Sequence, residues 1–317
     1  MKSAALLLNM GGPNNLDEVR TFMENMFDDK NILPVNRFIR KLIKKMIIKK
    51  RLEDAENNYR MLGGKSPLTE ISVSLASSVE KIAHMPVRPA MRYLPPYADE
   101  ALEEFERMGV EKIVLFPMYP HYSTTTTLSS YEDILLRLSS MSYNPTIELI
   151  DPYYDDPEYV DLECSSIEKA MGDRDPSEYM LLFSAHGLPV KIIESGDPYR
   201  EHVKKGCESI KRRLGQRGIV FGDDMLAYQS RVGSGEWLQP DLADLLRHPA
   251  KRKVLIYPVS FTIDNSETLF ELEIEHREIA EKAGCEEYIV AGCPNDSDEF
   301  ASFVARKISE AAGEVSV

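Results

Sequence analysis

The chain has 317 residues and a formal net charge of −14 at pH 7, with 43% hydrophobic and 28% charged residues. This composition is typical of a globular protein with two domains, and its acidity disfavours nucleic acid as a partner. The four cysteines show no paired spacing, so no zinc site, iron–sulfur cluster or disulfide framework is expected. No apolar run indicates a signal peptide or a membrane span, so a cytoplasmic location is expected.

The chain opens with an apolar run that ends in a glycine turn. Residues 3–9 predict a first strand, which leads through Met10 and the pair Gly11 and Gly12 to a helix over residues 14–27. The glycine pair lacks the flanking pattern of the known nucleotide-binding loops. The opening therefore predicts an α/β unit without indicating a nucleotide.

Residues 37–51, RFIRKLIKKMIIKKR, carry eight basic residues in an otherwise acidic chain, the first being Arg37 and the last Arg51. The apolar residues between them recur at helical spacing: Phe38, Ile39, Leu42, Ile43, Met46 and Ile47. This predicts an amphipathic helix that lies on anionic lipid or covers an apolar ligand. A core-facing helix with a solvated basic side fits the pattern equally well.

Two further strand ends carry polar and aromatic side chains. Arg92 and Tyr93 follow a strand that begins at Val87. A strand over residues 112–118 leads into a loop and helix whose aromatic and hydroxyl residues suit a flat aromatic ligand: Tyr119, Tyr122, Ser123 and Ser130. Tyrosines in loops are also common packing residues, so the pattern leaves both roles open.

His186 lies in the run FSAHGLP, residues 183–189, directly after the apolar run YMLLF. The apolar run predicts a buried strand, and open α/β sheets bind ligands beyond the carboxyl ends of their strands. His186 is therefore a candidate base or metal ligand, although a lone histidine is more often a packed or surface residue.

Residues 253–261 predict another strand because β-branched and aromatic side chains dominate, and Pro258 marks its exit. Asp264, Asn265 and Ser266 then offer side chains that can cap a helix reaching residue 280.

Glu267, Glu271 and Glu275 recur every four residues and so share one face of that predicted helix. Like charges at this spacing repel, which raises the pKa of at least one of them. The row predicts a path for protons or a set of cation ligands, and a solvated acidic face is the alternative.

The chain also contains a faint internal duplication. Residues 112–118, KIVLFPM, match residues 253–259, KVLIYPV, by residue class, and an earlier strand with a Gly-Pro turn precedes each. Together with the alternating strand and helix signals, this predicts an α/β fold of two similar Rossmann-like lobes. Each lobe is a parallel sheet flanked by helices, with the active-site cleft between the lobes.

The proline- and aspartate-rich residues 151–157 mark the boundary between these lobes. The N-terminal lobe is expected over residues 1–150, including the basic segment within residues 34–60. The C-terminal lobe is expected over residues 151–317 and carries His186 and Glu267.

Several motifs in this order resemble the ferrochelatases, enzymes that insert ferrous iron into a porphyrin. They are LLLNMGGP, FSAHGLP with GDPYREHV, YQSRVGSGEWLQP at residues 228–240, and FTIDNSETLFELEIE. The resemblance implies two Rossmann-like domains, Fe²⁺ and protoporphyrin IX as substrates, protoheme as product, and no permanent cofactor. The cluster-bearing C-terminal extension of the animal enzymes has no counterpart here, so no iron–sulfur cluster is expected.

By position, the resemblance makes His186 the catalytic histidine and Glu267 the catalytic glutamate, both in contact with the metal. It assigns Asp264, Glu271 and Glu275 to an acidic path. The porphyrin-binding positions it implies are Met10, Arg92, Tyr93, Tyr122, Ser130 and Trp237, and the basic segment matches the lip of the cleft. Asn265 stands where family members often have histidine or cysteine, and an amide does not titrate as those side chains do.

The chemistry of metal insertion agrees with these residues and leaves their roles open. A free-base porphyrin holds two pyrrolic protons in the plane that the metal must enter, so the enzyme needs a base, a metal source and a means of bending the ring. Imidazole and carboxylate suit both ferrous iron and proton transfer. Which of His186 and Glu267 takes protons and which delivers iron does not follow from the sequence.

Two alternatives remain. The first is a chelatase for another tetrapyrrole, sirohydrochlorin or coproporphyrin III, and the second is a tetrapyrrole carrier without turnover. The motif around Trp237 and the lip segment disfavour sirohydrochlorin, and the carboxylate row disfavours a carrier. Met10 favours protoporphyrin, because members that use coproporphyrin tend to carry tyrosine at this position.

Overall fold

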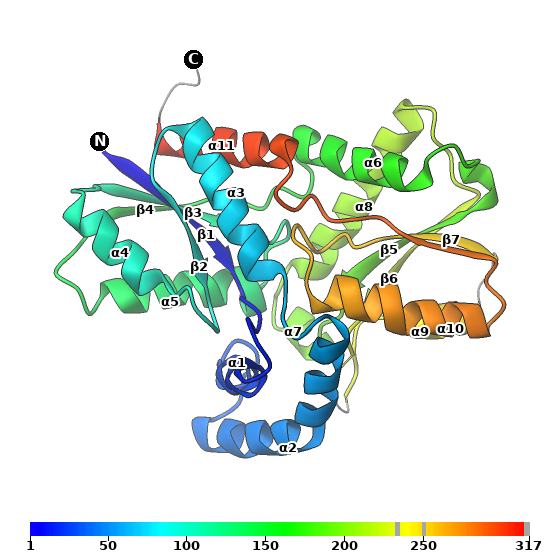
Figure 1. The fold of residues 1–317 in the computed structure, drawn as a ribbon, viewed down its shortest axis with the longest axis horizontal. Coiled ribbons are helices and arrows are strands. Elements are labelled where there is room, and N and C mark those ends of the chain that lie inside the picture. Colours follow the sequence, from blue (N-terminus) through cyan, green and yellow to red (C-terminus); the bar gives the residue numbers. More distant parts are fainter. Residues whose placement is uncertain (232–234, 249–251, 314–317) are drawn as a thin grey trace. The chain divides into compact units, whose positions relative to one another are not determined.

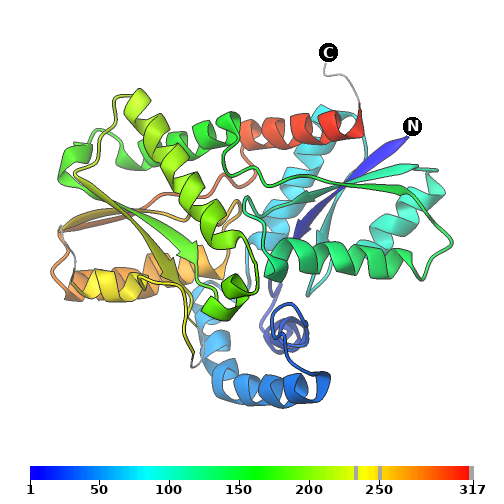
Figure 2. The same cartoon turned by 180° about the vertical axis from the view of Figure 1, so that it is seen from behind.

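The structure is a computed structural model that describes residues 1–231, 235–248 and 252–313 (Figures 1 and 2). The chain divides into two compact units. The first comprises Met1–Asp151 together with the chain from Asn295 onward, and the second comprises Pro152–Pro294.

The first unit contains a four-stranded sheet and the helices that flank it. Its elements are β1 (Ser3–Asn9), α1 (Glu18–Met26), α2 (Arg37–Met61), α3 (Leu68–Ala83), β2 (Val87–Met91), α4 (Ala98–Arg107), β3 (Lys112–Pro117), the π-helix η1 (Thr124–Leu128), α5 (Ser129–Leu138), β4 (Thr146–Leu149) and α11 (Asp298–Ala312).

The strands of this unit run parallel in the order β2-β1-β3-β4. Strand β1 is buried along its whole length, as expected of a strand covered on both faces. On one face Leu6 and Leu8 pack with Leu102 and Phe105 of α4 and Ile134 of α5. Helices α3 and α11 lie side by side and cover the other face (Figure 1).

Helix α11 belongs to the first unit, which corrects the expected division that gave all of residues 151–317 to the second lobe. Phe303 of α11 packs edge-on against Phe116 of β3, with ring centroids 6.5 Å apart. Lys112 at the start of β3 donates a hydrogen bond to the carbonyl of Ala311. The buried aromatic face of α11 thus completes the core of the first sheet.

The second unit repeats the plan of the first with a second four-stranded sheet. Its elements are α6 (Pro157–Met171), the 3₁₀-helix η2 (Pro176–Glu178), β5 (Met180–His186), α7 (Val190–Glu194), α8 (Tyr199–Gln216), β6 (Asp223–Gln229), α9 (Leu242–Arg247), β7 (Lys253–Tyr257), the π-helix η3 (Glu267–His276), α10 (Arg277–Lys282) and β8 (Glu287–Val290).

These strands also run parallel, in the order β6-β5-β7-β8, so both sheets share one topology. Leu181 and Phe183 face α6 and α8, where Ile167 and Val203 are buried. Met180 and Leu182 face the opposite side, which η3, α9 and α10 cover. The predicted fold class of two similar lobes with parallel sheets and flanking helices is confirmed.

Helix α2, which contains the basic segment, packs against α1 by one side only. Ile48 and Tyr59 of α2 are buried with Val19 and Met23 of α1. The other side exposes four apolar residues, here called the exposed apolar stripe: Phe38 (82% exposed), Ile39 (53%), Leu42 (62%) and Met46 (62%). The part of α2 around Ile48 therefore faces the core, whereas the exposed apolar stripe does not.

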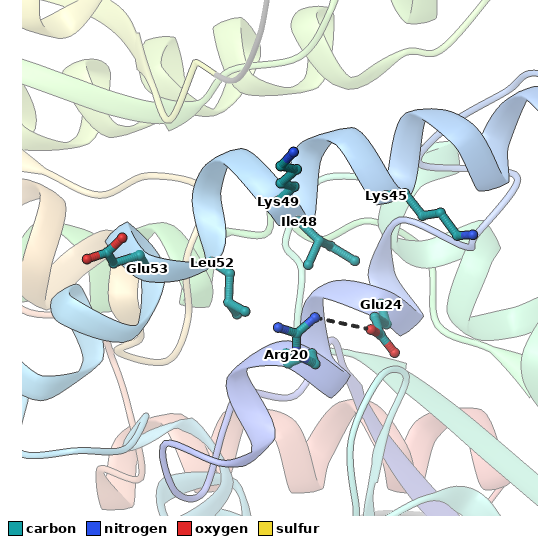
Figure 3. A pocket seen from close by; sticks show the side chains of 7 residues that line it. All are labelled: Arg20, Glu24, Lys45, Ile48, Lys49, Leu52 and Glu53. Atoms are coloured by element: carbon teal, nitrogen blue, oxygen red, sulfur yellow. Dashed lines mark ion pairs between the residues drawn. The ribbon is translucent and has the colours of Figure 1, made fainter.

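A surface groove of about 540 Å³ runs between α1 and α2 (Figure 3). Ile48 and Leu52 form its apolar floor. Charged residues surround this floor: Arg20, which pairs with Glu24 at 3.8 Å, and Lys45, Lys49 and Glu53. Among the described residues, no helix is both long and apolar enough to cross a membrane.

Candidate active site

In the second unit the strand order reverses between β5 and β7, and parallel α/β sheets bind ligands beyond the carboxyl ends of the strands at such a point. His186 is the last residue of β5, and η3, which follows β7, begins at Glu267. The Glu267 carboxylate lies close enough to the imidazole to act on its pKa. The two expected catalytic residues are thus neighbours at the switch point of one sheet.

Hydrogen bonds to the backbone hold His186 in place. The hydroxyl of Tyr199 donates to the carbonyl of His186 at 2.9 Å and also lies 2.7 Å from the Ser260 hydroxyl. The amide of Gly187 donates to the carbonyl of Gln229 at 2.8 Å. A Cβ at Gly187 would lie only 2.7 Å from that carbonyl oxygen, so the close approach of the two strands requires glycine here.

Burial lowers the pKa of His186, while the neighbouring Glu267 carboxylate raises it. The ring of Phe261 packs edge-on against the imidazole, with centroids 6.3 Å apart, and contributes to this apolar setting. A lowered pKa favours the neutral imidazole at pH 7. Its lone pair can then accept a proton or bind a metal ion.

Residues 267–276 form a π-helix, whereas the sequence predicted an ordinary helix over this stretch. Three side chains donate to its carbonyls: Gln229 Nε2 to Glu267 (3.1 Å), His276 Nδ1 to Glu271 (2.7 Å) and Tyr288 Oη to Leu272 (2.7 Å). Side-chain donors of this kind accompany wider helical turns, in which the carbonyls do not bond the backbone amides four residues later. Side-chain insertion of this kind is invisible to hydrophobic periodicity.

Glu271 titrates far from its ordinary range. Burial raises its pKa to about 8, and the neighbouring Glu267 carboxylate raises it as well. Its Oε2 accepts from Ser230 Oγ at 2.6 Å and from Gln229 Nε2 at 3.1 Å, and these bonds oppose the rise without reversing it. The prediction that one member of the acidic row has a raised pKa is confirmed, with burial as the larger cause.

The row of glutamates passes from half-buried to exposed. Glu267 and Glu271 are partly covered, and Glu275 is exposed. Asp264 lies just before η3, where its Oδ1 accepts from the Thr268 hydroxyl at 2.8 Å. Burial and the Asp264 carboxylate raise the pKa of the Cys293 thiol.

Asn265 caps the start of η3. Its Oδ1 accepts from the backbone amides of Glu267 at 2.9 Å and Thr268 at 3.1 Å. Thr268 Oγ1 accepts in return from the backbone amide of Asn265 at 3.0 Å. The residue that cannot titrate therefore has a clear structural role at the helix that carries Glu267.

Sequence reasoning missed two residues of this site. Gln229 is the last residue of strand β6 and Ser230 follows it, and both bond Glu271. One feature of the sequence could have indicated them. The run YQS at residues 228–230 lies at the end of a predicted strand, as AHG does at residues 185–187. Nothing in the sequence pairs that strand end with the later helix.

Trp237 belongs to the motif of residues 228–240, of which residues 232–234 lie outside the described residues. Its backbone forms an isolated β-bridge with Pro189, and a Cβ built at Gly187 would lie 3.5 Å from its ring. The half-buried indole therefore lies beside the loop that follows His186.

In the first unit, Met10 and Tyr122 follow β1 and β3, the strands on either side of the switch point of that sheet. Both side chains are half-buried. This position corresponds to that of His186 and Glu267 in the other sheet, at the edge where such folds bind ligands.

Two other expected porphyrin-binding residues of this unit, Arg92 and Tyr93, belong to an internal network. The Arg92 guanidinium contacts Asp29 at 3.2 Å and Asp133 at 3.3 Å. Tyr93, only 1% exposed, donates to Asp29 at 2.9 Å. Ser130 is buried as well. The structure thus explains Arg92 and Tyr93 by contacts within the unit.

Within the described part of the chain, no three His, Cys, Asp or Glu side chains are arranged to hold a metal ion. His186 and Glu267 supply one imidazole nitrogen and one carboxylate, both of which suit ferrous iron. The same pair can accept protons. The pair therefore supplies the chemical groups that both proton transfer and cation binding require.

The ferrochelatase family model matches residues 2–312 of the chain. A ferrochelatase of Wolinella succinogenes is 44% identical over 100% of both chains. One from Nitratiruptor sp. is 46% identical over 94% of this chain and 96% of its own, and one from Helicobacter pylori strain P12 is 41% identical over 97% and 93%.

Solved structures with a similar fold include SirB from Bacillus subtilis with Fe³⁺, at a TM-score of 0.56 and 14% identity over 98% of this chain and 96% of that one. CbiX, described as the terminal enzyme of siroheme biosynthesis in denitrifying bacteria, has a TM-score of 0.53 and 16% identity over 76% and 91%. At such low identity the likeness concerns the fold. The sequence matches over the full chain are decisive, and the chain belongs to the ferrochelatase family, as a lyase that inserts iron in heme synthesis.

Proposed function

We propose that the chain inserts ferrous iron into protoporphyrin IX to form protoheme, with His186 and Glu267 at the reacting centre. The supporting observation is the pairing of a half-buried imidazole with a carboxylate at the switch point of the second sheet. Fe²⁺ and the porphyrin are substrates, and no permanent cofactor takes part in the proposal.

In this proposal His186 accepts the pyrrolic protons that the porphyrin loses as iron enters. The neutral imidazole has a free lone pair, and the nearby Glu267 carboxylate stabilises the imidazolium that forms. Glu271, whose pKa is about 8, exchanges protons near neutral pH, and the exposed Glu275 releases them to water. Asp264 supports the start of this path through Thr268.

The remaining expected residues divide into two groups. We assign ring contacts to Met10 and Tyr122 at the strand ends of the first unit and to Trp237 beside the His186 loop. Arg92 and Tyr93 act through the internal network with Asp29, which supports the end of β2, and Ser130, which follows Ser129 in the chain, is buried.

An anaerobic absorbance assay with ferrous iron and protoporphyrin tests the proposal. At a protein concentration far below that of the porphyrin, the account predicts many metallated porphyrins per chain. One bound porphyrin per chain without further turnover would identify a carrier. Turnover of sirohydrochlorin without turnover of protoporphyrin would identify a chelatase of another tetrapyrrole.

We also propose that the protein is cytoplasmic and contacts the inner face of the membrane through residues 37–51. The exposed apolar stripe can enter the lipid interface, while the neighbouring lysines and arginines attract anionic headgroups. The overall charge of −14 makes this basic surface exceptional in the chain. Lys45 and Lys49 of the same helix also line the groove beside α1 (Figure 3).

Vesicle flotation tests this contact. Binding should require anionic lipid and weaken as salt rises, because each basic residue near the surface contributes on the order of 1 kcal/mol. Leu42→Ser with Met46→Ser should reduce binding, whereas Leu136→Ser, at an exposed leucine of α5, should not. Binding that ignores lipid charge would contradict the proposal.

A further inference from the structure

Gln229 connects the two halves of the candidate active site. It is the last residue of β6 and lies directly across the sheet from His186 in the parallel register. Its backbone carbonyl accepts from the Gly187 amide at 2.8 Å. The backbone of Gln229 therefore fixes the chain at the point where the His186 loop leaves the sheet.

The side chain of Gln229 reaches the other half of the site. Nε2 donates to the carbonyl of Glu267 at 3.1 Å and to Glu271 Oε2 at 3.1 Å. Oε1 accepts from the hydroxyl of Ser184 on β5. One residue thus bonds the His186 loop, the first residue of η3 and the half-buried carboxyl of Glu271.

These partners leave a single orientation for the amide. A backbone carbonyl can only accept, so the group that faces Glu267 must be the NH₂ group. Its two hydrogens are then used by the Glu267 carbonyl and the Glu271 carboxyl, and the Ser184 hydroxyl must be the donor to Oε1. A flipped amide would place an oxygen against two acceptors.

A purely apolar residue of similar size would not replace Gln229. Gln229 is 2% exposed, so the carbonyl of Glu267 and the Glu271 carboxyl would lose a donor in a place that water does not readily reach. The Glu267 carbonyl also belongs to the widened turn of η3, which depends on side-chain donors.

We propose that Gln229 is a positioning residue for iron insertion, which sets the placement of Glu267 relative to His186 and holds Glu271 in the acidic row. This inference rests on the proposed function of that pair. Because displacements of about 1 Å in a reacting pair can lower rates about 100-fold, loss of this one amide is expected to affect turnover more than substrate binding.

The test compares Gln229→Met and Gln229→Glu with the parent protein. Methionine keeps the length of the side chain and removes both donors, whereas glutamate places a carboxylate against two acceptors. We expect kcat for iron insertion to fall at least about tenfold in the methionine variant and further in the glutamate variant. The KM for the porphyrin should stay within about twofold of the parent value.

Gln216→Met is the matched control, because Gln216 is an exposed glutamine at the end of α8 with no bond to the site. It should keep the kcat of the parent. If Gln229→Met fails to fold, Ser184→Ala takes its place, since it removes only the donor to Gln229 Oε1 and should lower kcat by a few-fold. A folded variant, Gln229→Met or Ser184→Ala, with parental kcat would overturn the inference.

A second readout separates this inference from the proposed function. Crystal structures of the parent and Gln229→Met, solved under the same conditions, should differ by about 1 Å or more in the separation of the His186 ring and the Glu267 carboxylate. Absence of turnover in the parent would refute the proposed function alone. An unchanged separation in the variant would refute the role of Gln229.

Discussion

The hydroxyl of Tyr199 donates a hydrogen bond to the backbone carbonyl of His186 at 2.9 Å, which ties α8 to the carboxyl end of β5. We expect Tyr199→Phe to lower the free energy of unfolding by about 1 kcal/mol and kcat by about threefold to tenfold, because the carbonyl loses its partner and the loop shifts. Urea denaturation and steady-state kinetics measure the two effects.

Tyr143→Phe is the matched control for this change. Tyr143 also donates to a backbone carbonyl, that of Val110, at 2.9 Å, and it lies in the first unit. It should lose a similar stability and keep the parental kcat. Equal kcat values in the two variants would show that the bond to His186 only stabilises the fold.

Asn265→Ala removes the cap at the start of η3 and should destabilise the protein by about 1 kcal/mol, because two backbone amides lose their acceptor. Asn265→Asp should retain the stability, since a carboxylate accepts both bonds. Ser297→Ala is the control, because it removes the cap of α11 in the first unit. It should also destabilise the protein but leave kcat unchanged. An alanine variant at position 265 as stable as the parent would contradict this role.

Glu271→Gln tests the raised pKa of Glu271 through stability. In the folded protein the carboxyl titrates at about 8 instead of 4.5, so the folded state keeps a proton that the unfolded state has lost between these pH values. The parent must therefore lose stability as pH rises through this window. Glutamine still accepts from Ser230 and Gln229 but does not titrate.

The unfolding free energy of Glu271→Gln minus that of the parent should consequently rise between pH 5 and pH 8. Each pKa unit corresponds to about 1.4 kcal/mol, and partial exposure reduces the effect, so a rise of about 1–3 kcal/mol is expected. Urea titrations at both pH values measure it. A difference that does not change with pH would show that Glu271 titrates normally.

Met10 predicts the choice of porphyrin. An unbranched thioether offers an apolar, polarizable contact to the ring face, and an apolar contact of this kind suits vinyl groups better than two additional carboxylates. We expect a higher kcat/KM for protoporphyrin IX than for coproporphyrin III with ferrous iron. The opposite ranking would refute the inference from Met10 and leave the chelatase activity intact.

The lobes, His186 and the acidic row could be predicted from the sequence because each depends on local signals. Buried strands have apolar runs of sequence, and His186 ends one such strand while Glu267 begins the helix that comes after another. The four-residue spacing of the glutamates also indicated that one of them would resist ionisation, as Glu271 does.

What the sequence did not reveal depends on contacts between distant segments. Gln229 bonds residues 38 and 42 positions later, and no local pattern encodes that pairing. The π-helical turn of η3 arises from inserted side chains such as His276 and Tyr288. The amphipathic helix α11 contains no signal of which sheet it covers, so its place in the first unit does not follow from the sequence.

The most direct test of the central claim is the rate of iron insertion by His186→Ala. His186 ends a strand and its ring lies at the switch point, so the variant should fold normally but lose the group that accepts protons. We expect kcat to fall at least about 100-fold at saturating iron, while His248→Ala, at an exposed histidine, keeps the parental rate. A folded His186→Ala protein with more than about a tenth of the parental kcat would contradict the account.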